Sequence, residues 1–172
     1  RQGSTDNFLH LIENLDPLAA FAFCDQDDVW HPDKLGRAAA FLAAHSRPAA
    51  YAARTTVCDE NLHPLAPAPA FTRPLTFRNA LVQACMPGNT TVGNPAALRL
   101  LQAAASAARA ADIVSHDWWV YQLLSGAGAT LTRDRADRGL DQARADLAAQ
   151  LPQHTLAVHP RIRRYIDNMS RS

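Results

Sequence analysis

A short apolar run that ends in acidic residues stands out in the pattern of hydrophobic and polar positions. Residues 19–24 are all apolar, and residues 25–30 read Asp-Gln-Asp-Asp-Val-Trp. A short apolar run closed by a polar turn is typical of a buried strand in a parallel sheet. We therefore predict a buried strand over residues 19–24 and an acidic loop behind it, where the ligands of open α/β sheets bind.

Helical and alternating patterns on either side of this run predict an α/β domain. A first helix, capped by Thr5 or Asp6, should end at Asp16-Pro17. A second helix should start at residues 31–33 and turn Leu35, Ala38, Ala39 and Leu42 inward. Further predicted elements are strands at 50–57, 90–94 and 129–132, a short helix capped by Thr76, helices at 96–110 and 116–124, an irregular proline-rich connection at 62–74, a charged surface helix at 135–150 and a basic helix at 160–169.

Composition excludes several functional classes. The 172 residues are enough for one domain with a core, and their formal net charge is +1. A net charge this close to zero produces no strong electrostatic field that would attract nucleic acid or an anionic membrane. We therefore expect no nucleic-acid partner and at most peripheral membrane contact. The cysteines Cys24, Cys58 and Cys85 are odd in number and widely spaced, which favours reduced thiols in a cytosolic protein over disulfides or a zinc site.

The acidic loop is the first candidate site. Carboxylates as close as those of Asp25, Asp27 and Asp28 repel one another unless a cation lies among them. Hard ions such as Mg²⁺ or Mn²⁺ take oxygen ligands and often complete their shell with substrate phosphates. The residues therefore indicate a metal–phosphate site at a strand end. The alternative is a solvated acidic turn before a helix, which an isolated Asp-x-Asp favours.

Three segments together resemble the inverting family-two glycosyltransferases of the GT-A fold, in particular their rhamnosyltransferase-like branch. They are residues 3–8, residues 21–30, and the pair Pro87-Gly88-Asn89-Thr90-Thr91 and His116-Asp117-Trp118-Trp119. The acidic hexapeptide at 25–30 and the His-Asp-Trp-Trp motif at 116–119 together are more specific for this family than Asp-x-Asp alone. The resemblance implies a partial GT-A (Rossmann-like) fold with a mixed sheet flanked by helices over residues 1–134, followed by a helical extension over 135–172.

The resemblance also implies roles for the acidic residues. Asp25 and Asp27 would hold Mg²⁺ or Mn²⁺ on the diphosphate of a sugar nucleotide, and Asp28, also a candidate substrate-binding residue, would assist them or hydrogen-bond the loop. Asp117 stands at the position of the catalytic base, which takes the proton from the acceptor hydroxyl as that oxygen attacks the sugar. Without the resemblance, Asp117 would be read as a first-turn carboxylate stabilised by the helix dipole.

Five further residues are candidate substrate contacts, and four of them have a structural alternative. Trp30 would pack under the acidic loop, or serve as an ordinary core aromatic. Asn89 and Thr90 would face the donor sugar or the acceptor, or simply form a turn. His116 stands where many relatives have glutamate. Trp118 would be a core residue, or an exposed platform for a sugar ring.

The chain departs from the family pattern at two places. The opening strands that carry the site for the nucleotide base would precede Gly3, so we expect weak binding of a nucleotide sugar by this segment alone. The branch also follows its last helix with a strand and a Tyr-Arg-Gln-His sequence, whereas here Asp134 is followed directly by Arg135. We therefore expect a gap in the chain between Asp134 and Arg135.

These patterns predict an enzyme that transfers a hexose or deoxyhexose such as rhamnose, with inversion, from a nucleoside-diphosphate sugar to a saccharide or lipid-linked saccharide acceptor. Surface polysaccharide assembly, in the cytoplasm or at the inner face of the membrane, is the setting that the resemblance implies. Two alternatives stay open. One is a non-catalytic carbohydrate-binding or interaction protein that keeps the fold, and the other is a metal-dependent phosphohydrolase that uses the same acidic cluster.

Overall fold

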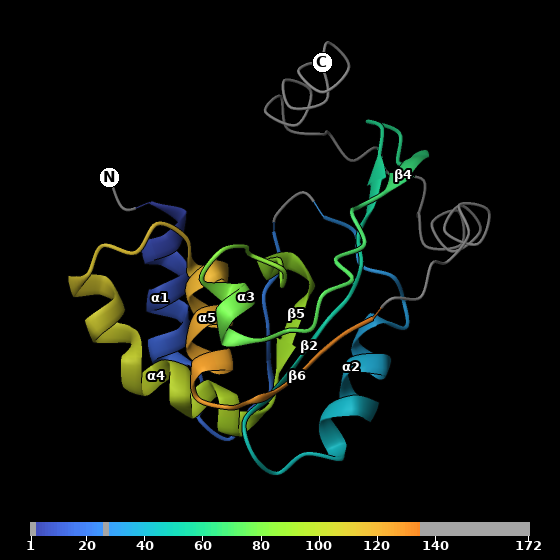
Figure 1. The fold of residues 1–172 in the computed structure, drawn as a ribbon. Coiled ribbons are helices and arrows are strands. Elements are labelled where there is room, and N and C mark those ends of the chain that lie inside the picture. The colour runs from blue at the N-terminus through green and yellow to red at the C-terminus, as the bar shows by residue number, and fades with distance from the viewer. Residues whose placement is uncertain (1–2, 26–27, 135–172) are drawn as a thin grey trace.

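A computed structural model describes residues 3–25 and 28–134 and shows a mixed sheet flanked by helices (Figure 1). The four strands lie in the order β1-β5-β2-β6. Strand β5 runs antiparallel to both β1 and β2, and β6 runs parallel to β2. The mixed α/β class is therefore confirmed. The strands are β1 (Phe21–Ala22), β2 (Ala49–Ala52), β5 (Thr91–Gly93) and β6 (Thr130–Arg133).

The prediction that residues 19–24 form a strand of a parallel sheet was wrong in length and direction. Only Phe21 and Ala22 pair, and their partner β5 runs antiparallel. Beyond them a single bond continues the pairing, from the Phe23 amide to the Thr91 carbonyl oxygen at 3.3 Å. The apolar run reflects burial of Phe21 and Phe23, and such a run is silent about the direction of the neighbouring strand.

Helices cover both faces of the sheet. Side chains of a strand alternate between faces, and β2 shows this clearly. Ala50 and Ala52 pack with residues of α1 (Ser4–Asn14), α4 (Pro95–Ala110) and α5 (His116–Gly126). Ala49 and Tyr51 pack with α2 (Lys34–Ala43) on the other face. Figure 1 shows α1, α4 and α5 gathered on one side of the strands and α2 on the other.

Helix α2 turns a different stripe toward the sheet than its sequence predicts. Ala38 and Leu42 are buried as expected, but Leu35 is 49% exposed and Ala39 is also exposed. Lys34 is buried in place of Leu35, with 6% of its surface exposed. Because Lys34, Ala38 and Leu42 recur every four residues, they form one row along the helix, and that row faces the sheet.

The predicted strand over residues 50–57 is two strands, and the predicted irregular connection contains a third. After β2, residues Thr56–Cys58 form β3, which pairs antiparallel with β4 (Pro64–Pro67). Prolines cannot donate to a ladder, so they led us to predict no strand at 62–74, but they are tolerated in edge strands. Figure 1 shows this hairpin projecting away from the main sheet.

Helix starts agree with the sequence in part. Thr76 caps α3 (Phe77–Ala80), accepting from the Asn79 amide at 3.2 Å. Gly3, and neither Thr5 nor Asp6, is the N-cap of α1. Asn94 caps α4, and its side-chain oxygen accepts from the amides of Ala97 (2.9 Å) and Ala49 (3.1 Å), which joins the helix start to β2. These caps satisfy backbone groups that a helix end would otherwise leave unpaired.

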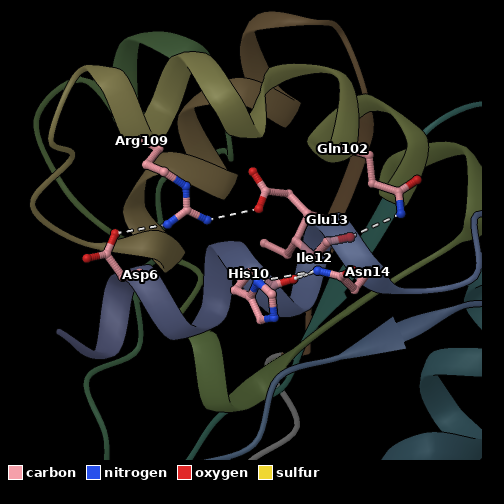
Figure 2. A network of polar contacts seen from close by, with 7 residues as sticks. All are labelled: Asp6, His10, Ile12, Glu13, Asn14, Gln102 and Arg109. Carbon is pink, nitrogen blue, oxygen red and sulfur yellow. Dashed lines mark hydrogen bonds and ion pairs between the residues drawn. The ribbon is translucent and has the colours of Figure 1, made fainter. Parts of the chain in front are cut away.

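Polar contacts fix α1 against α4 (Figure 2). The guanidinium of Arg109 donates to Asp6 at 3.3 Å and to Glu13 at 2.9 Å. The Gln102 amide donates to the carbonyl oxygens of Ile12 (3.0 Å) and Leu15 (2.8 Å), which lie at the end of α1 where carbonyls lack helical partners. Helix α1 is thereby held in place beside α5, where its Phe8 meets the candidate site.

Several predictions concern parts of the chain outside the described residues. These are the helices at 135–150 and 160–169, the division at residue 134, and the expected gap between Asp134 and Arg135. Among the helices that the structure describes, none combines the length and the apolar character needed to cross a lipid bilayer.

Candidate functional site

A short turn brings together segments that lie far apart in the sequence. The 3₁₀ turn η1 (Gly88–Thr90) leads directly into β5 in the middle of the sheet. The side-chain amide of Asn89 donates to the carboxylate of Asp28, 61 positions away. The backbone amide of Gly88 donates to Asp117 Oδ2 at 3.2 Å, 29 positions away. Two consecutive residues of η1 therefore connect the acidic loop with the start of α5.

Asp117 is held by hydrogen bonds on both carboxylate oxygens. Oδ2 accepts from the Gly88 amide, and Oδ1 accepts from the Ser115 hydroxyl and from the amide of Trp118 at 2.8 Å. Asp117 lies in the first turn of α5, where the helix dipole favours a negative charge. A carboxylate offers about four lone-pair sites. Three donors therefore orient Asp117 and leave it acceptor capacity, which a catalytic base needs.

The acidic loop closes on itself through its backbone. The Asp28 amide approaches the Asp25 carbonyl oxygen at 3.4 Å, and both side chains are exposed. Asp27, the second predicted metal ligand, lies outside the described residues. Within residues 3–25 and 28–134 no group of three or more His, Cys, Asp or Glu could hold a metal ion. The exposed carboxylates of Asp25 and Asp28 nevertheless have the oxygen chemistry that suits Mg²⁺ or Mn²⁺ bound largely through substrate phosphates.

Lys34 contacts both Trp30, which follows the acidic loop, and the turn η1. Its ammonium nitrogen is 3.6 Å from the centroid of the Trp30 ring and 2.5 Å from the Asn89 carbonyl oxygen. Burial lowers the pKa of Lys34 to about 8, while the neighbouring Cys24, Asp28 and Asp25 act in the opposite direction. Trp30 is half-buried and offers Lys34 the face of its ring.

Lys34 was missed in the sequence analysis. An amphipathic pattern places lysine on the solvent side of a helix. Here Lys34 is buried through its contacts with Trp30 and with Asn89, which lies 55 positions away. One signal was present in the sequence. Of the 17 lysine and arginine residues in the chain, Lys34 is the single lysine, and it lies six positions after Asp28.

His116 belongs to an aromatic cluster beneath the turn. Its ring stacks on Phe8, with centroids 3.8 Å apart and an angle of 18° between the planes, and meets Phe23 edge-on at 5.2 Å. Its Nε2 atom is buried without a hydrogen-bond partner among the described residues. A Cβ atom on Gly88 would lie 2.8 Å from that nitrogen, so the absence of a side chain at position 88 lets the turn approach α5.

The charge of His116 should control stability in mild acid. Burial lowers its pKa from the ordinary value of 6.5, and the adjacent Asp117 opposes that shift. As the pH falls, the unfolded chain therefore takes up the proton before the folded protein does. The stability that neutral His116 provides is complete above pH 6.5 and is lost as the pH falls from there toward the folded-state pKa.

We expect His116→Phe to keep the aromatic stacking and to weaken this pH dependence. Urea unfolding between about pH 7 and about pH 5 should show a smaller loss of stability in the variant than in the original protein. An equally steep loss in both proteins would mean that His116 is not the titrating group.

The structure places Thr90 within its turn, as its structural alternative describes, whereas Trp118 is half-buried and lies outside the buried core clusters. Thr90 is 3% exposed, and its hydroxyl donates to the Pro87 carbonyl oxygen at 2.9 Å, within its own turn. The indole nitrogen of Trp118 donates to the Ala80 carbonyl oxygen at 2.6 Å and joins α5 to α3. Contact of either side chain with a substrate stays a prediction, whereas Asn89 is half-buried and bonded directly to the acidic loop.

Comparison with family models, with curated proteins and with solved structures gives no match for this chain. The assignment of function therefore depends on the residues that the turn brings together and on the chemistry they can perform.

Proposed function

We propose that this chain is part of an inverting glycosyltransferase of the GT-A type, which moves a sugar from a nucleoside diphosphate to a saccharide or lipid-linked saccharide acceptor. One observation carries the proposal. The acidic loop and the start of α5, which the resemblance pairs in one active site, are both hydrogen-bonded to the turn at Gly88 and Asn89. A sequence that merely contained these motifs by chance would have no reason to bring them together in space.

The residues divide the reaction into two tasks. Asp117 takes the proton from the acceptor hydroxyl, and the donors from Gly88 and Ser115 hold its carboxylate in one orientation. Asp25 and Asp27 would hold Mg²⁺ or Mn²⁺, which supplies Lewis-acid stabilisation of the departing diphosphate when bound. Asp28 is engaged by Asn89, so it acts on the shape of the loop. Assembly of a surface polysaccharide, at the cytoplasmic side of the membrane, is the proposed setting.

The metal assignment predicts a specific gain in thermal stability. In the protein encoded by the full reading frame, Mn²⁺ or Mg²⁺ together with a nucleoside diphosphate at about 100 times its Kd should stabilise the fold by about 2.7 kcal/mol. That corresponds to a rise in Tm on the order of 5 °C for a domain of this size. Asp27→Asn should abolish the rise, because a neutral amide is a poor ligand for a hard cation.

The matched control is Asp112→Asn, which removes an exposed carboxylate in the turn after α4. Asp112 has a positive φ of 48°, a conformation that asparagine also tolerates. An unchanged rise in Tm for Asp27→Asn would contradict the metal assignment. Release of phosphate from simple esters would favour a phosphohydrolase, and saccharide binding that needs no metal and leads to no transfer would favour a non-catalytic carbohydrate-binding protein.

A further inference from the structure

Lys34 is in an unfavourable place for a lysine that only supports the fold. It is the one charged side chain that is buried among the described residues. It also occupies the first position of α2, where the helix dipole disfavours a positive charge. A buried ammonium costs free energy unless partners replace its water. The structure must therefore compensate this charge through specific contacts.

The partners that Lys34 has among the described residues belong to the candidate site. The Asn89 carbonyl oxygen accepts its hydrogen bond at 2.5 Å, and the Trp30 ring faces its ammonium at 3.6 Å. The carboxylates of Asp28 and Asp25 favour its charged form. Two groups of Asn89 are thus engaged by residues 28–34: its backbone carbonyl oxygen accepts from Lys34, and its side-chain NH₂ group donates to Asp28.

We propose that Lys34 is a positioning residue of the donor site. It holds η1 against the acidic loop, so that the side-chain amide of Asn89 fixes the Asp28 carboxylate. The role in donor binding depends on the proposed function, whereas the positioning of Asn89 does not. Lysine suits the place better than arginine, because a compact ammonium on a flexible stem fits between a ring face and a carbonyl oxygen. Helix α2 is itself anchored through Arg37, which pairs with Asp134 at the end of β6.

The positioning can be measured in the free protein. We expect Lys34→Met to move the NMR resonances of the Asn89 side-chain amide toward those of a solvent-exposed asparagine, because the Asn89 carbonyl oxygen loses its bond to Lys34. Asn89→Ala identifies these resonances by removing them. The matched control is Arg99→Met, which removes an exposed cation that also donates to a backbone carbonyl oxygen, that of Pro17 at 3.0 Å. It should leave the Asn89 amide unchanged.

Donor binding then separates positioning from direct contact with a phosphate. In the full-length protein, Lys34→Met should weaken metal-dependent binding of a nucleoside diphosphate by about tenfold to about 100-fold, the range seen when outer-shell partners of metal ligands are removed. In a protein that already carries Asn89→Ala, the same change should add little, because the amide that Lys34 positions is gone. If Lys34 instead contacted a phosphate directly, the losses of affinity caused by Lys34→Met and by Asn89→Ala would multiply in the double variant.

Each outcome decides a separate claim. Unchanged Asn89 resonances in Lys34→Met, or multiplying losses in the double variant, would overturn the positioning role. Absence of metal-dependent nucleoside diphosphate binding by the original protein would overturn the proposed function, and the NMR comparison would still decide whether Lys34 positions Asn89. Misfolding is checked by the Tm of Lys34→Met, which we expect to be maintained because an apolar side chain of similar length replaces a buried charge.

Discussion

Asp117→Asn should lower the rate of sugar transfer by about 10²- to 10⁴-fold while leaving the fold intact. Asparagine has nearly the same shape but a single side-chain oxygen, so it can accept from the backbone amide of Gly88 or from that of Trp118, which donate to different oxygens of Asp117, and not from both. The loss of one such bond should cost about 1 to 3 kcal/mol, which the fold should survive. Asparagine cannot take a proton from the acceptor hydroxyl, and kcat should therefore fall. The measurement is the rate of product formation by the full-length protein at saturating donor and acceptor, together with its Tm.

The matched control for Asp117 is Asp6→Asn. Asp6 is the acidic residue in the first turn of α1, so it interacts with a helix dipole as Asp117 does. It lies on the surface between α1 and α4, where it pairs with Arg109 (Figure 2). We expect Asp6→Asn to cost about 0.5 kcal/mol of stability and no activity. If Asp117→Asn behaves in the same way, Asp117 is only a helix-start carboxylate.

Gly93→Ala should destabilise the protein by about 1 to 3 kcal/mol, because the sheet has no room for a side chain there. A Cβ atom on Gly93 would lie 2.2 Å from Cε1 and 2.5 Å from Cζ of Phe21, its partner across the β1–β5 ladder. Phe21 is buried against Phe23, so its ring must leave a packed position. Strand β1 leads into the acidic loop, and donor binding should weaken together with stability. Urea unfolding measures the loss of stability.

Two control variants test the cause of that loss. In a protein that carries Phe21→Ala, the further change Gly93→Ala should cost little, because the clashing ring is absent. Gly36→Ala in α2 should have the opposite sign, since a Cβ there meets nothing within 4 Å and alanine favours a helix. Equal losses from Gly93→Ala in both backgrounds would show that the ring contact is not responsible.

The starts of the helices α4 and α5 could be predicted almost to the residue, because their information is local. Helix α4 begins at Pro95 and ends at Ala110, as the proline start and the run of helix formers indicate. The strands were harder to predict, since a two-residue strand such as β1 leaves little pattern and its direction depends on a neighbour 70 positions away. The hairpin β3–β4 was missed because prolines, which usually exclude a strand, lie on its edge.

The residues of the candidate site could be predicted in part. The sequence pointed to Asp28, Asn89 and Asp117, and the structure brings these three together through η1. It did not point to Lys34, whose burial depends on tertiary partners that no local pattern encodes. The pairing of Asp25 with Asp27 stays a prediction, because Asp27 lies outside the described residues.

The order β1-β5-β2-β6 has a consequence for how the protein folds during synthesis. In the described sheet no two neighbouring strands follow each other in the chain, so a local hairpin cannot start it. The central pairing of β2 with β5 closes a segment of about forty residues, and β6 joins only when residue 133 has been made. Until α4 and α5 have been made, the face of β2 that carries Ala50 and Ala52 lacks most of its cover on a growing chain. A stalled ribosome that has released fewer residues should therefore present a chaperone substrate, and the acidic loop and Asp117 can meet only after the start of α5 has left the ribosome.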